Sequence, residues 1–471
     1  MTNNITGDNI SPRLFGTSGI RGRIDEFLTP AFAERVCLSF ATLLSNQGTC
    51  LVGRDVRSES EMIQKAVMSG LSAGGVDALD CGVAPTPATL FALKKLRYQA
   101  AVMVTGSHVP APTTGMLFFL DDTGEMDSRG EERLEAVFRS EQSRRVPSSE
   151  EGSIGTLEIL DIYQNEIRRQ LGSLGNYRVV VDPGNGATCA TIGWILKDLD
   201  CDVITINGRP DGTFPSRSTY PQPSTLGELA SAVKDAKADL GVGTDSDGDR
   251  ALFATEDGQV LWGDVTGAFF VKSELETRGG GRIVSTVNTS GLVELLCQQY
   301  GGSLTVTKVG PPAIAEALRK HKDVIFATEE SGKHIWPDAI LYGDAALATG
   351  KLLQIMKRKQ KSLEELYREL PKFHQFKSTI PCSERLKSLA FRLILETWKP
   401  PKDARMSTID GLKVTYPNLS WFLVRYSGTE PIFRCQSESQ SLDEAQKLHE
   451  IATELVRNAI AKAENNEKHP S

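Results

Sequence analysis

Short apolar runs alternate with amphipathic stretches along most of this chain, and this alternation predicts β-strands and α-helices in turn. Among residues 1–153, runs at 49–52, 76–79 and 101–104 predict strands, while 60–71 and 88–96 have the spacing of helices. An earlier helix is expected to begin at Pro30, with Thr29 as its N-cap. The same alternation continues through two further blocks, with predicted strands at 177–182, 238–243, 282–286, 303–307 and 324–327.

The last hundred residues follow a different pattern. They contain a helical stretch at 384–398, two short apolar runs separated by Asp410-Gly411, and a long helix from Leu442. This succession predicts a smaller α+β unit with an antiparallel sheet. We therefore expect an α/β protein of four domains, followed by a disordered tail at 464–471. The expected domains are residues 1–153, 154–256, 257–371 and 372–471.

Composition narrows the class of protein. The chain has 471 residues, 40% hydrophobic and 24% charged, and a formal net charge of −7, so it lacks the basic excess of a nucleic-acid-binding protein. There is no run of 18 apolar residues and no leader-like start, which predicts a cytoplasmic protein that does not bind membranes. Eight cysteines without a CxxC pair argue against a zinc site or a disulfide framework.

One serine stands where chemistry is expected. The apolar run 101–104 ends in a turn that contains Gly106, Ser107 and His108, and prolines nearby prevent regular structure. In α/β sheets, ligands bind at the carboxyl ends of strands. A surface serine in a proline-rich turn explains the same pattern equally well.

Three aspartates alternate at the end of the run 238–243. In the stretch TDSDGDR, Asp245, Asp247 and Asp249 can face one point from an extended loop, and carboxylate oxygens select magnesium or calcium. An EF-hand is the competing interpretation, because Glu256 stands at the twelfth position. Arg250 occupies the sixth position, where an EF-hand needs glycine, so a catalytic divalent metal site is favoured.

Three other polar loops have residues suited to sugar phosphates. The glycine-rich stretch 14–25 contains Arg21, and the stretch 425–431 combines an arginine with two hydroxyls and a glycine, all donors that suit phosphate. Glu329 and Ser331 could bind a vicinal diol. The stretch 14–25 and the turn of Glu329 and Ser331, each taken alone, are equally consistent with a solvated turn.

Five motifs, LFGTSGIRG, TGSHVPAP, DSDGDR, EESG and RYSGTEP, occur in this order with domain-sized gaps. Their set resembles the α-D-phosphohexomutase superfamily, the phosphoglucomutases and phosphomannomutases, over essentially the whole chain. The resemblance implies three consecutive α/β domains with mixed sheets and a smaller α+β carboxyl-terminal domain around a central cleft. It also implies that each domain contributes one loop to that cleft.

The resemblance implies a role for each loop. Ser107 would carry the phosphoryl group beside His108 and share Mg²⁺ with the three aspartates. Hexose phosphates would be the small-molecule partners, and a hexose 1,6-bisphosphate the intermediate and activator, in a monomer or homodimer. Glu329 and Ser331 would bind sugar hydroxyls, while the non-transferred phosphate would bind Arg425, Ser427, Gly428 and Thr429. The transfer site would be flanked by Arg21, Arg250 and Lys308.

Two positions depart from the family pattern. Val109 replaces the usual asparagine, and Gly115-Met116-Leu117 lacks the lysine that commonly follows. In the sugar loop, Lys333 stands where the family commonly has histidine, and His334 follows one place later. We therefore expect Lys333 or His334 to supply the proton-transfer group.

These observations favour a magnesium-dependent mutase that interconverts hexose 1-phosphates and hexose 6-phosphates, with phosphomannomutase/phosphoglucomutase activity. A phosphoglucosamine mutase is an alternative, because GTSGIRG and SGTEP also suit that branch. A sugar-phosphate-binding paralogue that turns over poorly is a third possibility.

Overall fold

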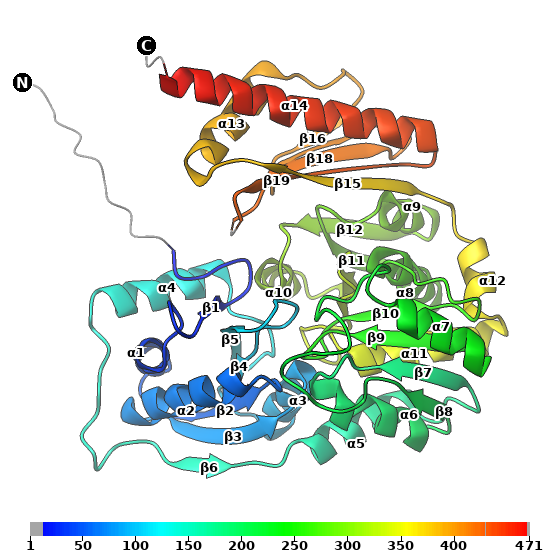
Figure 1. The fold of residues 1–471 in the computed structure, drawn as a ribbon. Coiled ribbons are helices and arrows are strands. Elements are labelled where there is room, and N and C mark those ends of the chain that lie inside the picture. Colours follow the sequence, from blue (N-terminus) through cyan, green and yellow to red (C-terminus); the bar gives the residue numbers. More distant parts are fainter. Residues whose placement is uncertain (1–12, 429, 469–471) are drawn as a thin grey trace, which may run out of the picture.

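The computed structural model describes residues 13–428 and 430–468. It contains four sheets, each with its own helices (Figure 1). The first three sheets are mixed and the fourth is antiparallel, which confirms the expected fold class. In Figure 1 the carboxyl-terminal unit lies above the other three.

The first sheet has six strands in the order β1-β5-β4-β2-β3-β6. Its strands are β1 (Ile20–Arg23), β2 (Thr49–Arg54), β3 (Asp77–Val83), β4 (Ala100–Val104), β5 (Thr113–Leu120) and β6 (Ile154–Thr156). Its helices are α1 (Pro30–Leu43), α2 (Ser58–Ala73), α3 (Thr86–Leu96) and α4 (Ser128–Arg139). Thr29 caps α1 by accepting a hydrogen bond from the Phe32 amide, as the sequence predicted.

Strand β4 is buried on both faces. Val102 and Val104 belong to the apolar cluster that includes α1 and α2, while Ala101 and Met103 belong to the cluster that includes α3. This division follows from the two-residue period of a strand. It fixes the direction in which the loop after β4 leaves the sheet.

The second sheet, ordered β10-β9-β7-β8, contains β7 (Arg178–Asp182), β8 (Asp202–Thr205), β9 (Leu240–Thr244) and β10 (Ala251–Ala254). It is accompanied by α5 (Leu160–Leu171), the 3₁₀ turn η1 (Ala187–Ala190), α6 (Ile192–Asp198) and α7 (Gly227–Ala236). The third sheet, ordered β12-β11-β13-β14, contains β11 (Gly281–Thr286), β12 (Gly302–Thr307), β13 (Val324–Thr328) and β14 (His334–Ile335). Its helices are α8 (Gly263–Arg278), α9 (Gly291–Gln299), α10 (Pro311–Lys320), α11 (Ala345–Lys359) and α12 (Leu363–Arg368).

The first three sheets share one plan. In each, a central strand (β2, β7 or β11) pairs in parallel with the next strand of the chain on one side and with the strand after that on the other. An antiparallel strand then follows this third strand directly in the chain. The third strands are β4, β9 and β13. The loops after them are the three that the sequence analysis singled out for Ser107, the aspartates and Glu329.

The first three domains also share an apolar core. One cluster contains Phe91 of α3, Tyr163 of α5, Phe269 of α8 and Leu352 of α11, all buried. Phe91 and Tyr163 have ring centroids 5.7 Å apart. This shared core holds the loops of three domains in fixed relative positions.

The fourth sheet is ordered β15-β19-β18-β17-β16 and packs against two helices. Its strands are β15 (His374–Pro381), β16 (Arg405–Ser407), β17 (Leu412–Thr415), β18 (Trp421–Tyr426) and β19 (Ile432–Ser439). The helices are α13 (Glu384–Thr397) and α14 (Leu442–Lys468).

Three details differ from the expectations. Strand β6 pairs with β3, so the first sheet extends past residue 153. Strand β15 was not predicted, because polar residues interrupt its apolar positions. Helix α14 continues to Lys468, so the expectation of a disordered tail is wrong for residues 464–468. Within the described part of the chain, no helix combines the length and apolar content that a membrane span requires.

Candidate active site

Ser107 lies directly after β4 and is 1% exposed. Its backbone has a φ of 48°, a left-handed conformation that is uncommon for a residue with a side chain. Its Oγ donates to Asp245 Oδ2 at 3.1 Å and lies 3.4 Å from His108 Nδ1. The structure therefore brings the serine of the first domain to an aspartate of the second.

The three aspartates form one buried group in the hairpin between β9 and β10. Each of Asp245, Asp247 and Asp249 offers a carboxylate oxygen within 4.8 Å of the others. Burial raises the pKa of Asp245 well above its usual range, and the other two carboxylates add to that effect. Burial and Asp249 raise the pKa of Asp247 to about 6. The neighbouring elements are strands, which agrees with the interpretation against an EF-hand.

These residues fit a hard cation. Asp247 Oδ1 and Asp249 Oδ1 are buried, and neither has a hydrogen-bond partner among the described residues. Buried carboxylate oxygens without donors are unfavourable unless a cation or another donor satisfies them. The donor set contains only oxygen, which is the set that magnesium and calcium prefer.

Cationic side chains surround the aspartates. Lys333 Nζ binds Asp249 and also donates to the Tyr342 hydroxyl at 3.1 Å. Arg250 Nε lies 3.6 Å from Asp245 Oδ2. The Nε of Arg21 is buried without a hydrogen-bond partner in residues 13–428 and 430–468.

The positive side chains also affect His108. Burial lowers the pKa of His108 well below its usual value, and Arg250 and Arg21 lower it further. His108 is therefore neutral at physiological pH. Its ring lies beside Tyr220, with centroids 5.4 Å apart.

The structure does not bring His334 to this group. His334 lies in β14, with its ring against Phe270 and Phe326 in the interior of the third domain. Its two ring nitrogens pair with the hydroxyls of Thr266 and Thr328. Burial lowers the pKa of His334 to about 3. Successive side chains of an extended segment point to opposite faces, so Lys333 faces the aspartates while His334 faces the core.

The loop that contains Glu329 and Ser331 lies in the hairpin between β13 and β14. Ser331 Oγ donates to Glu329 Oε1 at 2.5 Å, while Glu329 Oε2 is buried and has no hydrogen-bond partner in the described chain. The next carboxylate, Glu330, receives a hydrogen bond from Asn288 at 2.7 Å and pairs with Lys377 of the fourth domain. Lys308, which follows β12, is exposed.

The loop that the sequence analysis assigned to phosphate, residues 425–431, begins at the end of β18. Arg425 Nη2 pairs with Asp410 Oδ2 at 3.1 Å, and the same oxygen accepts from the Val309 amide at 3.1 Å. Ser427 is buried, Gly428 is exposed, and Thr429 lies outside the described residues. Arg425 thus pairs with Asp410 rather than with any of the three aspartates.

Sequence reasoning missed two residues beneath the serine loop and one beneath the phosphate loop. Asp55 and Arg57 are fully buried after β2 and form an ion pair that contacts the loop of Ser107. Lys387 of α13 is buried and donates to the carbonyls of Ser427 at 2.5 Å and Glu430 at 3.1 Å. The only available signal was the turn RDVRS, two arginines and an aspartate directly after a strand.

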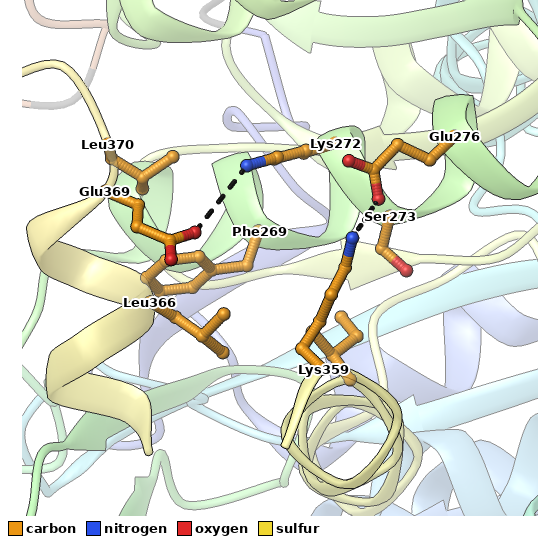
Figure 2. A pocket seen from close by; sticks show the side chains of 9 residues that line it. Phe269, Lys272, Ser273, Glu276, Lys359, Leu366, Glu369 and Leu370 are labelled. Carbon is orange, nitrogen blue, oxygen red and sulfur yellow. Dashed lines mark hydrogen bonds and ion pairs between the residues drawn. The ribbon is translucent and has the colours of Figure 1, made fainter. Parts of the chain in front are cut away.

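A surface hollow between α8, α11 and α12 has no part in this site. Its lining includes Lys272, Glu276, Lys359 and Glu369 (Figure 2). Figure 2 shows that each lysine is matched by a glutamate, with Lys359 Nζ 2.7 Å from Glu276 Oε2 and Lys272 Nζ 4.0 Å from Glu369 Oε2. The charges of the hollow are neutralised internally, so we assign it no role.

Comparison with known proteins agrees with this geometry. The chain matches the domain families described as phosphoglucomutase/phosphomannomutase, alpha/beta/alpha domains I, II and III, over residues 12–145, 160–258 and 262–373. It therefore belongs to the phosphoglucomutase/phosphomannomutase family of the α-D-phosphohexomutase superfamily. It is an isomerase-class phosphotransferase, like its relatives.

Two relatives and one solved structure show how far the similarity extends. The chain is 35% identical to a phosphoglucomutase/phosphomannomutase of Thermococcus kodakarensis, over 95% of this chain and 99% of that protein. It is 36% identical to a relative named probable phosphoglucosamine mutase from Pyrococcus abyssi, over 96% and 99% respectively. The crystal structure of a phosphoglucomutase/phosphomannomutase family protein from Burkholderia thailandensis matches with a TM-score of 0.85 and 25% identity, covering 97% of this chain and 98% of that one.

Proposed function

We propose that this phosphohexomutase interconverts hexose 1-phosphates and hexose 6-phosphates through a phosphorylated Ser107 and a bound 1,6-bisphosphate. The observation that carries the proposal is the contact between the Ser107 hydroxyl and Asp245, at the edge of a buried acidic group with unsatisfied oxygens. Phosphoryl transfer depends on positioning and on compensation of charge, and both are present here.

The proposed cycle has two balanced transfers. Phosphorylated Ser107 gives its phosphoryl group to the free hydroxyl of a hexose 1-phosphate, and the serine oxygen regains a proton. The bisphosphate then reorients within the site, so that its other phosphate faces Ser107. The Ser107 hydroxyl loses its proton and its oxygen attacks the phosphorus at C1, while the C1 oxygen leaves, takes a proton and so completes the hexose 6-phosphate.

The other loops would bind the sugar in both orientations. Glu329 and Ser331 would hold two hydroxyls, which explains the buried Glu329 oxygen without a partner. Arg425, Ser427, Gly428 and Thr429 would bind the non-transferred phosphate. Arg21, Arg250 and Lys308 would compensate charge beside the transferred group.

Magnesium bound by Asp245, Asp247, Asp249 and the Ser107 phosphoryl group would supply charge compensation at the transferring phosphate. A solved N-acetylphosphoglucosamine mutase of Aspergillus fumigatus is a complex with GlcNAc-6P and magnesium, and it has the same fold at 14% identity with a TM-score of 0.55. The magnesium in that complex supports the choice of magnesium here.

Lys333 is the side chain that we propose for proton handling and charge compensation beside Asp249. In this proposal it takes the role of the lysine that the family commonly has after Gly115, where Met116 and Leu117 of this chain are buried in the sheet. His334 has no part in this proposal, because its ring lies in the apolar core.

Ser107→Ala should take no phosphoryl group from glucose 1,6-bisphosphate, because the accepting oxygen is removed. The parent should gain one phosphate in intact-mass analysis, and peptide mapping should locate it on Ser107. Ser140→Ala, at an exposed serine that ends α4, is the labelling control and should still accept a phosphate. A phosphate of equal occupancy on the Ser107→Ala protein would contradict the assignment.

Asp247→Asn should weaken magnesium binding by at least roughly tenfold, because one anionic ligand is lost from a site of three. Calorimetric titration with Mg²⁺ measures the affinity directly, and circular dichroism checks that the fold is kept. Asp257→Asn, an exposed aspartate in the turn after β10, is the matched control. Equal magnesium affinity in both variants would contradict the metal site.

Lys333→Met should lose most of its turnover, whereas His334→Gln should keep the pH profile of the parent. The folded-state pKa of His334, about 3, lies below its ordinary 6.5, so this ring stays neutral and does not titrate between pH 5 and 9. Its contribution to stability is present above pH 6.5 and is lost as the pH falls towards 3. A changed pH profile of turnover in folded His334→Gln would contradict this placement.

The sugar is tested by a mutase assay on glucose, mannose and glucosamine 1-phosphates, primed with the matching 1,6-bisphosphate. We expect the glucose and mannose compounds to have the highest kcat/KM. The relatives named as phosphoglucosamine mutases make glucosamine 1-phosphate the second candidate. Preference for that compound would replace the first choice, and phosphorylation without turnover on any sugar would indicate a binding paralogue.

A further inference from the structure

A buried arginine lies directly beneath the loop of Ser107. Arg57 has no exposed side-chain surface and forms an ion pair with Asp55 in the turn after β2. Its Nη2 donates to the Ser107 carbonyl at 3.1 Å and to the Val109 carbonyl at 2.5 Å. One guanidinium group therefore binds both ends of a three-residue segment that contains the serine.

All three carbonyls of this segment receive donors. The Ser246 hydroxyl donates to the Ser107 carbonyl at 2.7 Å, and the Thr219 hydroxyl donates to the His108 carbonyl at 2.7 Å. Carbonyl oxygens are partly negative, so oxygens left without donors beside the serine would repel an incoming phosphoryl group. The donors offset this repulsion and fix the backbone at the same time.

Asp55 extends the same network to the residues before the serine. Its Oδ2 accepts from the Thr105 hydroxyl at 2.9 Å and from the Gly106 amide at 3.1 Å, and its Oδ1 accepts from Ser60 at 2.7 Å. Together, Asp55 and Arg57 contact the backbone or side chains of four of the five residues from 105 to 109.

The local sequence is adapted to this arginine. A Cβ at position 106 would lie 2.5 Å from Arg57 Cζ, so only glycine permits the guanidinium to come this close. Phe214 of the second domain covers the other side, with its ring centroid 4.9 Å from Arg57 Cζ. The arginine is thus enclosed by two domains at the point where the serine and the aspartates meet.

We infer that Arg57 is a positioning residue for phosphoryl transfer, which rests on the function proposed above for Ser107. Its Nη1 is held by Asp55 while its Nη2 holds the left-handed backbone of Ser107, and this sets the direction in which the hydroxyl faces Asp245. A buried ion pair is weak evidence for a role in stability, whereas strained backbone is typical of functional sites.

The test compares Arg57→Lys with the parent in single-turnover phosphorylation of Ser107 by glucose 1,6-bisphosphate. Lysine keeps a charge beside Asp55, but its single nitrogen cannot hold Asp55 and both carbonyls in the fixed plane in which Nη1 pairs with Asp55 and Nη2 donates to the carbonyls. We expect the transfer rate and kcat to fall roughly 100-fold, because small errors of alignment have effects of this size. KM for the hexose 1-phosphate should change by less than about threefold, since the substrate contacts remain.

Phe40→Leu is the matched control for stability, because Phe40 is buried in the core of the same domain against Phe118 and does not touch the loop. It should lower the melting temperature while the transfer rate stays near that of the parent. The inference is overturned if the transfer rate of Arg57→Lys lies within about twofold of that of Phe40→Leu while both variants lose a similar amount of melting temperature.

Ser246→Ala provides a second measurement, which decides the matter if Arg57→Lys does not fold. It removes one donor to the Ser107 carbonyl, so transfer should slow severalfold, and an unchanged rate overturns the inference. In the double variant with Arg57→Lys, the two effects should combine to less than their product, because both act on one carbonyl. If the parent itself takes no phosphate on Ser107, the proposed function fails as well, which distinguishes the two failures.

Discussion

The repulsion among three buried aspartates is the constraint on which the rest of this site depends. Their carboxylate oxygens lie within 4.8 Å of one another, and unit charges about 4 Å apart interact by roughly 4 kcal/mol at an effective dielectric constant of about 20. Arg250 comes from the same hairpin, but Lys333 must come from the next domain. Charge compensation therefore requires the second and third domains to be correctly assembled, and it makes a bound cation the simplest completion of the site.

The repeated sheet plan explains how three domains can supply these groups. Each of the first three sheets places its active loop in the hairpin between the third parallel strand and the antiparallel strand after it. The backbone of such a loop is held at both ends by ladder hydrogen bonds, so its side chains have defined directions. The shared apolar core then orients the three hairpins relative to one another. A common local design thus delivers a serine, three aspartates and the pair Glu329 and Ser331 to corresponding hairpins of the three domains.

The sequence predicted most of this plan, because strands and active loops have local signatures. Ser107 and the aspartates were found from an apolar run followed by a polar turn. The direction of Lys333 and His334 could not be predicted, because both residues follow the same strand and only tertiary packing decides which one faces the core. Arg57 escaped notice for another reason. Its role depends on backbone carbonyls fifty residues away in the chain. Every residue has such a carbonyl, so the sequence cannot indicate which ones Arg57 binds.

Buried cations that bind loop carbonyls recur in this molecule. Arg57 binds carbonyls of the Ser107 loop, and Lys387 binds the Ser427 carbonyl. Arg217 donates to the carbonyl of Asp182 and to that of Thr244, the residue before Asp245. Each such cation loses hydration, yet each engages carbonyl oxygens that would otherwise repel phosphate or a neighbouring carboxylate. An enzyme that transfers phosphoryl groups must present positive groups and amides on the surface of its site. When buried cations bind the loop carbonyls from the inner side, those partly negative oxygens no longer face the site. The site then needs no additional exposed charge to compensate them.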